Sequence, residues 1–125
     1  MSTPHKKHND GFLALVNDAK SRVKQINIQE YQKLPRGEHV LIDVREPHEY
    51  QIAKIPYAKL IPLGELPKRV NELNSADEIV AHCKSGMRSA KAVEFLKQAG
   101  FKKVKNMKGG ILAWSDKVDP SVPKY

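Results

Sequence analysis

The sequence has one cysteine, few aromatic residues and no long apolar run, and each shortage narrows its possible functions. A single cysteine among 125 residues cannot form an internal disulfide, which fits a reducing compartment. Aromatic residues make up 6%, and no run alternates them with basic residues as single-strand nucleic-acid binders do. Uninterrupted apolar stretches such as residues 12–16 are far too short to span a bilayer.

The start of the chain and the overall charge bear on location and partners. Residues 1–12 contain no apolar segment long enough for a signal peptide, so we expect a cytoplasmic protein. The net charge of +8 is compatible with nucleic acid, anionic lipid, an acidic protein or a small anion as partner. A lysine-rich solvated surface explains the charge equally well. Because aromatic residues are scarce and apolar runs are short, we expect neither nucleic acid nor a membrane as partner.

Short apolar runs alternate with helical patterns along the chain. The expected strands are residues 26–28, 39–44, 59–63, 78–83 and 103–107. The expected helices are residues 12–24, 47–52, 63–73, 89–100 and 110–117, with a further short helix after residue 28. This alternation predicts an α/β fold with a mostly parallel central sheet of about five strands, flanked by helices on both faces. We expect residues 26–125 to form one domain and residues 1–25 an N-terminal extension with a helix.

The only cysteine, Cys83, ends one of the apolar runs, and "KSGMRS" follows it. In open parallel sheets, ligands bind beyond the carboxyl ends of the strands. Gly86 allows a tight turn and leaves room for an incoming group. A curled loop of this length, followed by a helix starting near Arg88 or Ser89, directs backbone N–H groups and positive charge inward. The loop therefore favours an anion.

The same surroundings favour the thiolate, which is the nucleophilic form of cysteine. An isolated free cysteine is more often an inert core residue. A core cysteine, however, has no need of the glycine, cations and hydroxyl groups that follow this one. We predict that Cys83 is the catalytic nucleophile. The predicted substrate-binding residues are those of the loop, Lys84, Ser85, Gly86, Met87, Arg88 and Ser89.

Two kinds of enzyme use a cysteine placed in this way. One hydrolyses phosphate esters through a cysteinyl phosphate, and arsenate reductases are related to it; the other transfers a sulfane sulfur through a persulfide. Cysteine phosphatases are recognised by five residues between cysteine and arginine, whereas four residues separate Cys83 from Arg88. The smaller loop favours the persulfide. The non-enzymatic alternative is a regulatory domain that keeps the fold, and loss of the cysteine would favour it.

Several motifs, in the expected order, resemble the rhodanese-like sulfurtransferases over residues 26–125. They are "CKSGMRS" at the active-site loop, "LIDVREPHEY" before the first signature and "GGILAW" at the second signature. The segment "AKIPYAKLIPL" stands where the family has Gly-His-Ile-Pro-Gly-Ala, so Ala53, Lys54 and Tyr57 depart from the pattern. Within the family, the chain looks most like the rhodanese domain fused to adenylyltransferases that activate sulfur-carrier proteins. No nucleotide-binding glycine loop accompanies it here.

The resemblance implies a thiosulfate sulfurtransferase that needs neither cofactor nor metal. Basic loop residues, here Lys84 and Arg88, are typical of family members that use thiosulfate. By this resemblance, Cys83 takes the outer sulfur and releases sulfite, Arg88 fixes the loop and the anion, and Lys84 and Ser85 orient the donor. No second cysteine is present to resolve the persulfide. The acceptor is therefore external: cyanide, a thiol or a sulfur-carrier protein.

Other polar residues receive more ordinary interpretations. Asp43 and Arg45 follow a strand end and are candidates for shaping the site, but a structural pairing with Glu46 or Glu49 is the stronger expectation. His82 precedes Cys83, and since neighbours in a strand point to opposite faces, we do not expect it to act as the base. No metal site is expected, because the remaining histidines show no metal-ligand spacing with a cysteine. These are His5, His8, His39 and His48, and Trp114 is expected as a core anchor.

Overall fold

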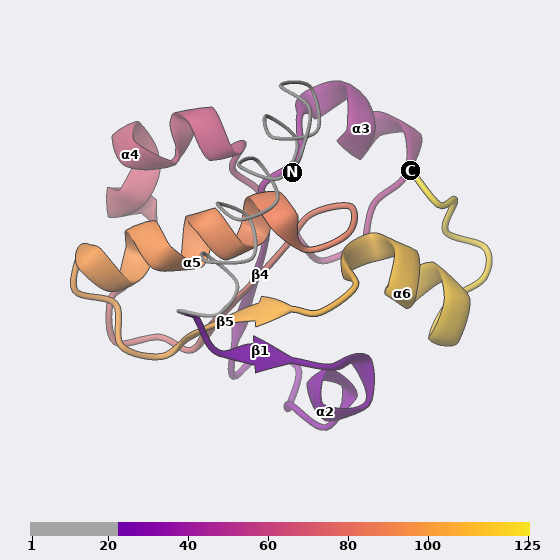
Figure 1. Ribbon diagram of the computed structural model, residues 1–125, viewed down its shortest axis with the longest axis horizontal. Coiled ribbons are helices and arrows are strands. Elements are labelled where there is room, and N and C mark those ends of the chain that lie inside the picture. The colour runs from indigo at the N-terminus through magenta and orange to yellow at the C-terminus, as the bar shows by residue number, and fades with distance from the viewer. Residues whose placement is uncertain (1–22) are drawn as a thin grey trace, which may run out of the picture.

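The computed structural model describes residues 23–125, which are built around one five-stranded sheet (Figure 1). All the strand pairings are parallel, and the strand order is β1-β5-β4-β2-β3. The strands are β1 (Gln25–Ile26), β2 (Val40–Asp43), β3 (Lys59–Leu60), β4 (Ile79–His82) and β5 (Val104–Met107). The predicted α/β fold with a parallel five-stranded sheet is confirmed.

The helices follow the predicted order, with one clear difference. They are α2 (Ile28–Gln32), α3 (Pro47–Ile52), α4 (Leu66–Arg69), α5 (Met87–Gln98) and α6 (Gly110–Lys117). The predicted continuous helix over residues 63–73 is wrong, because α4 is flanked by two 3₁₀ turns, Leu63–Glu65 and Val70–Glu72. Pro67 explains the break before α4, since its ring lacks an N–H and would collide with a carbonyl one turn earlier. The predicted helix over residues 12–24 lies almost wholly outside the described residues.

The first strand is shorter than predicted because a helix cap ends it. The side chain of Asn27 accepts a hydrogen bond from the Glu30 N–H at 2.8 Å, and Glu30 Oε1 accepts from the Asn27 N–H at 3.0 Å. This reciprocal capping box starts α2 at once. Ile28, which was expected at the end of the strand, is therefore the first residue of the helix.

Helices cover both faces of the sheet (Figure 1). Side chains of α4 and α5 pack on one face in a cluster that includes Leu66, Val93 and Leu96. Side chains of α2 and α6, among them Tyr31 and Trp114, pack on the other face. Double coverage explains why the central strands read as continuous apolar runs rather than as alternating ones. None of the helices within residues 23–125 has both the length and the apolar character needed to cross a bilayer.

The parallel arrangement brings the carboxyl ends of the central strands to one edge of the sheet. β2 ends at Asp43, β4 ends at His82 beside Cys83, and β5 ends at Met107. At this edge the connection from β4 to α5 lies beside the start of α6 (Figure 1). The fold thus places the cysteine loop where open parallel sheets usually bind ligands.

Candidate active site

The loop after β4 curls around the sulfur of Cys83. Cys83 is 1% exposed, and its Sγ accepts hydrogen bonds from the Gly86 N–H at 3.1 Å and the Ser89 N–H at 3.4 Å. The Ser89 hydroxyl lies 3.3 Å from the same sulfur. A thiolate can only accept hydrogen bonds, so donors that converge in this way favour negative charge on the sulfur.

The conformation of Gly86 makes this turn possible. Its φ angle of +111° lies in the left-handed region, which residues other than glycine rarely adopt. An added Cβ would meet its nearest neighbour, Asn106 Nδ2, at an ordinary 3.7 Å. The backbone angle, rather than lack of space, therefore requires glycine here. α5 begins directly after it at Met87, slightly earlier than the sequence suggested.

The start of α6 holds the start of the cysteine loop. The Ile111 N–H donates to the Cys83 carbonyl at 2.9 Å, and the Leu112 N–H donates to the Lys84 carbonyl at 3.2 Å. These are first-turn N–H groups, which have no partner inside their own helix. Gly110 has a φ of +55°, and a Cβ there would collide with both carbonyl groups. The glycine pair of "GGILAW" is therefore part of the site, a role that sequence reasoning missed.

Arg88 is paired with a carboxylate from another helix. Its Nη1 and Nη2 donate to Glu49 Oε1 and Oε2 at 2.7 and 2.9 Å, so the loop is tied to α3. The Arg88 guanidinium holds the pKa of Glu49 at about 2, below its ordinary 4.5. The same hydrogen bonds raise the pKa of Arg88. The pair is therefore fully charged at neutral pH, and both outer nitrogens of Arg88 are occupied.

Asp43 and Arg45 bind one another at the end of β2. Both side chains are 0% exposed, and Arg45 Nη2 lies 2.7 Å from Asp43 Oδ2. Arg45 also donates to the backbone carbonyls of Ala53 at 2.6 Å and Glu49 at 3.4 Å, which ties β2 to α3. The expected pairing of Arg45 with a carboxylate of Glu46 or Glu49 is wrong, because Asp43 is the carboxylate that it binds. The hydrogen bonds of the Asp43–Arg45 pair therefore serve to hold the end of β2 against α3.

His82 does not face the sulfur. Its buried ring places Nδ1 at 3.1 Å from the Cys83 carbonyl and Nε2 at 3.6 Å from Asp43 Oδ2. A carbonyl only accepts, so Nδ1 carries the hydrogen. Burial lowers the pKa of His82, which keeps the ring neutral. Within residues 23–125 no hydrogen bond links His82 to Sγ, in agreement with the expectation that it is not the base.

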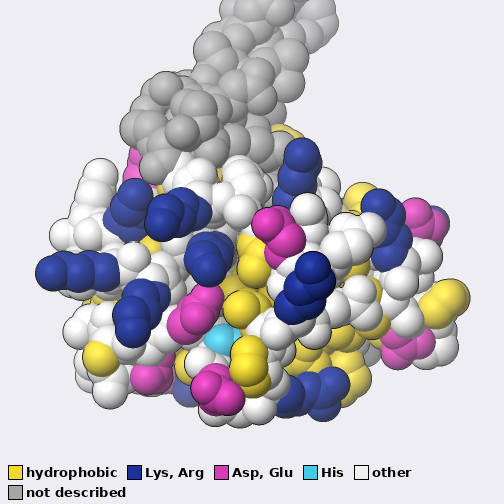
Figure 2. All heavy atoms as spheres, turned by 90° about the horizontal axis from the view of Figure 1, so that it is seen from below, with side chains coloured by type: hydrophobic (Ala, Val, Ile, Leu, Met, Phe, Trp, Pro, Cys, Tyr) yellow, Lys and Arg dark blue, Asp and Glu magenta, His cyan; other side chains and the backbone are white. Residues whose placement is uncertain are grey.

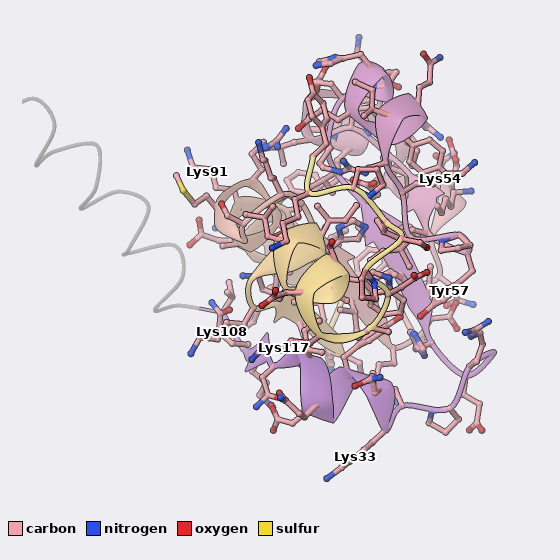
Figure 3. The ribbon with its side chains drawn as sticks, turned by 90° about the vertical axis from the view of Figure 1, so that its right-hand side faces the viewer. Lys33, Lys54, Tyr57, Lys91, Lys108 and Lys117 are labelled. Atoms are coloured by element: carbon pink, nitrogen blue, oxygen red, sulfur yellow. The ribbon has the colours of Figure 1, made fainter. Side chains whose placement is uncertain are left out.

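The remaining loop residues lie at the surface. Lys84 and Ser85 are exposed, and Met87 is half-buried. Lys84 Nζ lies 5.4 Å from the centre of the Tyr125 ring, and Lys84 forms no ion pair with any described residue. The end of the molecule that carries α6 is also basic, because Lys91, Lys108 and Lys117 project outward from it (Figure 3). Residues 23–125 contain no group of side chains that could hold a metal ion.

Two functional contacts of the loop come from residues far away in the sequence. The sequence suggests Glu49 only as a partner for Arg45 and suggests no role for Asn106. Asn106 Oδ1 accepts from the Ser89 hydroxyl at 2.5 Å, and Asn106 Nδ2 donates to the Gly86 carbonyl at 3.1 Å. The available signal for Asn106 is a polar, uncharged residue between Lys105 and Met107 in the last expected strand.

Comparison with known proteins agrees with this geometry. A family model described as "Rhodanese-like domain" matches residues 27–117. A rhodanese-related protein from Thermoplasma volcanium has a solved structure with a TM-score of 0.69 and 32% identity, and the match covers 76% of this chain and 93% of that one. The sulfurtransferase of Allochromatium vinosum is 39% identical over 85 residues, which cover 67% of this chain and 79% of that protein.

Two longer relatives are connected with sulfur carriers. YrkF of Bacillus subtilis, named as a candidate sulfur carrier protein, is 44% identical over 101 residues, covering 79% of this chain and 55% of that protein. The adenylyltransferase and sulfurtransferase MOCS3 of Arabidopsis thaliana is 33% identical over 123 residues, covering 86% of this chain and 26% of that protein. This chain therefore spans about half of one relative and a quarter of the other. From its sheet, its cysteine loop and these matches, we conclude that the chain belongs to the rhodanese-like domain family, whose members include sulfurtransferases.

Proposed function

We propose that the chain is a sulfurtransferase that carries a sulfane sulfur as a persulfide on Cys83. The observation that carries this proposal is the convergence of three donor groups, from Gly86 and Ser89, on one buried sulfur. The loop closes on the sulfur itself, which suits one added sulfur atom better than a tetrahedral phosphate. The sulfurtransferase names of matched relatives support the same reaction class.

The proposed reaction has two balanced steps. The Cys83 thiolate attacks the outer sulfur of thiosulfate, a new S–S bond forms, and sulfite leaves with the electron pair of the broken bond. The persulfide then gives its outer sulfur to a nucleophile, and the thiolate returns. Loop N–H groups hold the charge on sulfur through both steps. Arg88 positions the loop through Glu49, while Lys84 and Ser85, both exposed at its surface, orient the donor.

Thiosulfate is the proposed donor because it is a small dianion. Lys84 presents a cation that no described carboxylate neutralises, next to the sulfur-binding loop. Arg88 contributes less free charge than the sequence suggests, since Glu49 occupies its outer nitrogens. The long-range attraction of an anion therefore depends mainly on lysine side chains.

The proposed acceptor is an external thiol or a sulfur-carrier protein, and cyanide is its laboratory substitute. Cys83 is the only cysteine in the sequence, so the chain has no second thiol that could attack the persulfide and form a disulfide. The relation to YrkF and MOCS3 supports a carrier as acceptor. We place the reaction in the cytoplasm, where a lone thiol remains reduced.

The decisive experiment loads the protein with thiosulfate, removes the excess and determines the mass of the intact chain. We expect a gain of about 32 Da, one sulfur atom, that cyanide discharges. The Cys83→Ser variant should fold normally and gain nothing. A gain from a different persulfide donor alone would replace thiosulfate but keep the reaction class. Sulfur transfer by Cys83→Ser, or cleavage of phosphate esters without any persulfide, would contradict the proposal.

A further inference from the structure

Asn106 is a buried polar residue whose side chain connects three segments of the chain. It lies in β5, is 0% exposed, and pairs with Gln25 of β1 in the sheet register. Removing an amide group from water is unfavourable unless all its hydrogen-bonding atoms find partners. The partners of Asn106 therefore show why a polar residue is kept at this position.

Its hydrogen bonds fix the amide in one orientation. Oδ1 accepts from the Ser89 hydroxyl at 2.5 Å, while Nδ2 donates to the Gly86 carbonyl and to Gln25 Oε1, each at 3.1 Å. A carbonyl oxygen and an amide oxygen can only accept, so the two N–H groups of Asn106 must face them. Rotation of the amide by 180° would bring oxygen against oxygen.

The bond to Gly86 helps to fix the direction of the next peptide group. In a planar trans peptide the N–H points opposite to the C=O. The Gly86 carbonyl points to the buried Asn106 and, as the N-cap carbonyl, also accepts the first hydrogen bond of α5, so the N–H of Met87 points the opposite way, out of the start of that helix. Met87 is the first residue of α5, and its N–H has no partner among the described residues. This N–H is therefore free to bind an incoming group at the start of α5.

Asn106 and the first hydrogen bond of α5 hold this peptide in place. A cavity of about 230 Å³ borders the outer side of the loop. Its lining consists of Gln25, Ser85, Gly86, Asn106, Lys108 and Gly109. Because open space lies beside Gly86 there, hydrogen bonds rather than packing hold the peptide on that side. Glycine, here at a φ of +111°, restrains its own backbone least, so these bonds matter at this position.

The bond to Ser89 controls a second donor. A hydroxyl group has one hydrogen, and Ser89 Oγ lies between Asn106 Oδ1 and Cys83 Sγ. While that hydrogen goes to Asn106, the Ser89 oxygen can accept the S–H of the neutral thiol. The bond to Asn106 also fixes the position of Ser89, whose backbone N–H donates to Cys83 Sγ at 3.4 Å.

We propose that Asn106 is a positioning residue for the sulfur transfer proposed above: it binds Gly86 and Ser89, and so holds both residues where their backbone N–H groups face Cys83. It acts before the sulfur donor arrives, because all its bonds are present in the unloaded protein. Donors that are already aimed at the developing charge need no reorganisation during the reaction.

The test compares three variants at position 106 with a matched control. Asn106→Leu keeps the size of the side chain without its hydrogen bonds, and Asn106→Ala removes the side chain. Asn106→Asp keeps the oxygen that accepts from Ser89 but loses the donor to Gly86, so it remains informative if the other two fold poorly. Val104→Ala is the control, because Val104 is a buried β5 residue that lies two positions away on the same face of the strand.

We expect the maximal rate of persulfide formation to fall about 10- to 100-fold in the Asn106 variants, with the KM for thiosulfate changing less than about threefold. We also expect the pH profile for alkylation of Cys83 by iodoacetamide to move about one unit toward higher pH. Since Cys83 is the only thiol, every alkylation signal belongs to it. Val104→Ala should lower the thermal midpoint but leave rate and profile nearly unchanged.

The two measurements separate this inference from the proposed function. If the parent protein forms no persulfide from any donor, the proposed function fails, while the alkylation profile still reports on the donors around the sulfur. If folded Asn106 variants match Val104→Ala in both rate and profile, Asn106 has only a structural role and the inference is wrong.

Discussion

At the scale of single residues, backbone and hydroxyl donors surround the sulfur, and the arginine of the loop, Arg88, is already paired. Gly86 and Ser89 direct donors at Sγ, whereas both outer nitrogens of Arg88 bind Glu49. The charge on a thiolate or persulfide is therefore stabilised mainly by fixed dipoles. Arg88 contributes by holding the loop against α3.

The Arg88–Glu49 pair leads to the first prediction. Glu49→Gln should leave Arg88 without its carboxylate and should slow persulfide formation about five- to tenfold, because the loop loses its tie to α3. The loss in the free energy of unfolding should be only about 1 kcal/mol, since the Arg88 side chain is 36% exposed and water screens the pair. Urea denaturation and the intact-mass assay measure the two effects. Glu72→Gln, which breaks an exposed pair with Arg69, should leave the rate of persulfide formation and the free energy of unfolding nearly unchanged.

The stabilisation from Glu49 should depend on pH. Its pKa in the folded protein is about 2, below the ordinary 4.5, so between these values the unfolded chain binds more protons than the native one. The stabilisation is fully present above the ordinary value and is lost as the pH falls toward the folded one. The difference in urea midpoint between the parent and Glu49→Gln should therefore shrink on acidification. A constant difference down to about pH 3 would show that the charge of Glu49 is not what stabilises the loop.

The part of the site that is contiguous in sequence could be predicted, and the part assembled by the fold could not. Residues 83–89 show their chemistry in the spacing of small, basic and hydroxyl side chains after an apolar run. Glu49 reaches Arg88 across 39 positions, and Asn106 reaches Gly86 across 20. No local pattern encodes such contacts. They follow from the order of the strands and from the packing of α3 beside the loop.

At the scale of secondary structure, three elements meet at the cysteine loop. β4 delivers Cys83, α5 begins at Met87 and supplies the Ser89 N–H, and the first turn of α6 binds the carbonyls of Cys83 and Lys84. The helix starts thus perform different tasks. The start of α5 faces the sulfur, whereas the start of α6 fixes the backbone that carries it.

Periodicity predicted the elements better than their boundaries. α3 and α6 have their predicted bounds, because apolar periodicity and end signals agree there. The predicted helix over residues 63–73 was interrupted by Pro67, and the first predicted strand was shortened by the Asn27 cap. In both places a local hydrogen-bonding constraint outweighed the hydrophobic pattern.

The α6 contact leads to a prediction for Gly110. Gly110→Ala should lower the free energy of unfolding by about 2–4 kcal/mol, since alanine disfavours a positive φ and its Cβ would press on the Cys83 and Lys84 carbonyls. Displacement of these carbonyls should also reduce persulfide formation. Urea denaturation and the mass assay would measure both. Gly64→Ala is the matched control, because Gly64 has no positive φ and nothing lies within 4 Å of an added Cβ. Equal stability of the two variants would mean that α6 does not hold the loop.

At the scale of the whole molecule, the net charge of +8 is the dominant property. Lys and Arg side chains are spread over the face seen in Figure 2, with Asp and Glu among them. Several lysines also project from the end that carries α6, as Figure 3 shows for Lys91, Lys108 and Lys117. A positive field of this kind attracts anions of any structure, so it favours rapid encounter rather than recognition.

This field should make capture of an anionic sulfur donor sensitive to salt. We expect kcat/KM for thiosulfate to fall about three- to tenfold as the ionic strength rises from about 20 to 200 mM, because the screening length shortens. Alkylation of Cys83 by neutral iodoacetamide should change little over the same range. Lys84→Gln should flatten the salt dependence, since Lys84 stands at the loop, whereas Lys33→Gln, on the helix α2 side, should not. An equal salt effect on the thiosulfate and iodoacetamide reactions would mean that salt acts on the fold of the loop rather than on the approach of the anion.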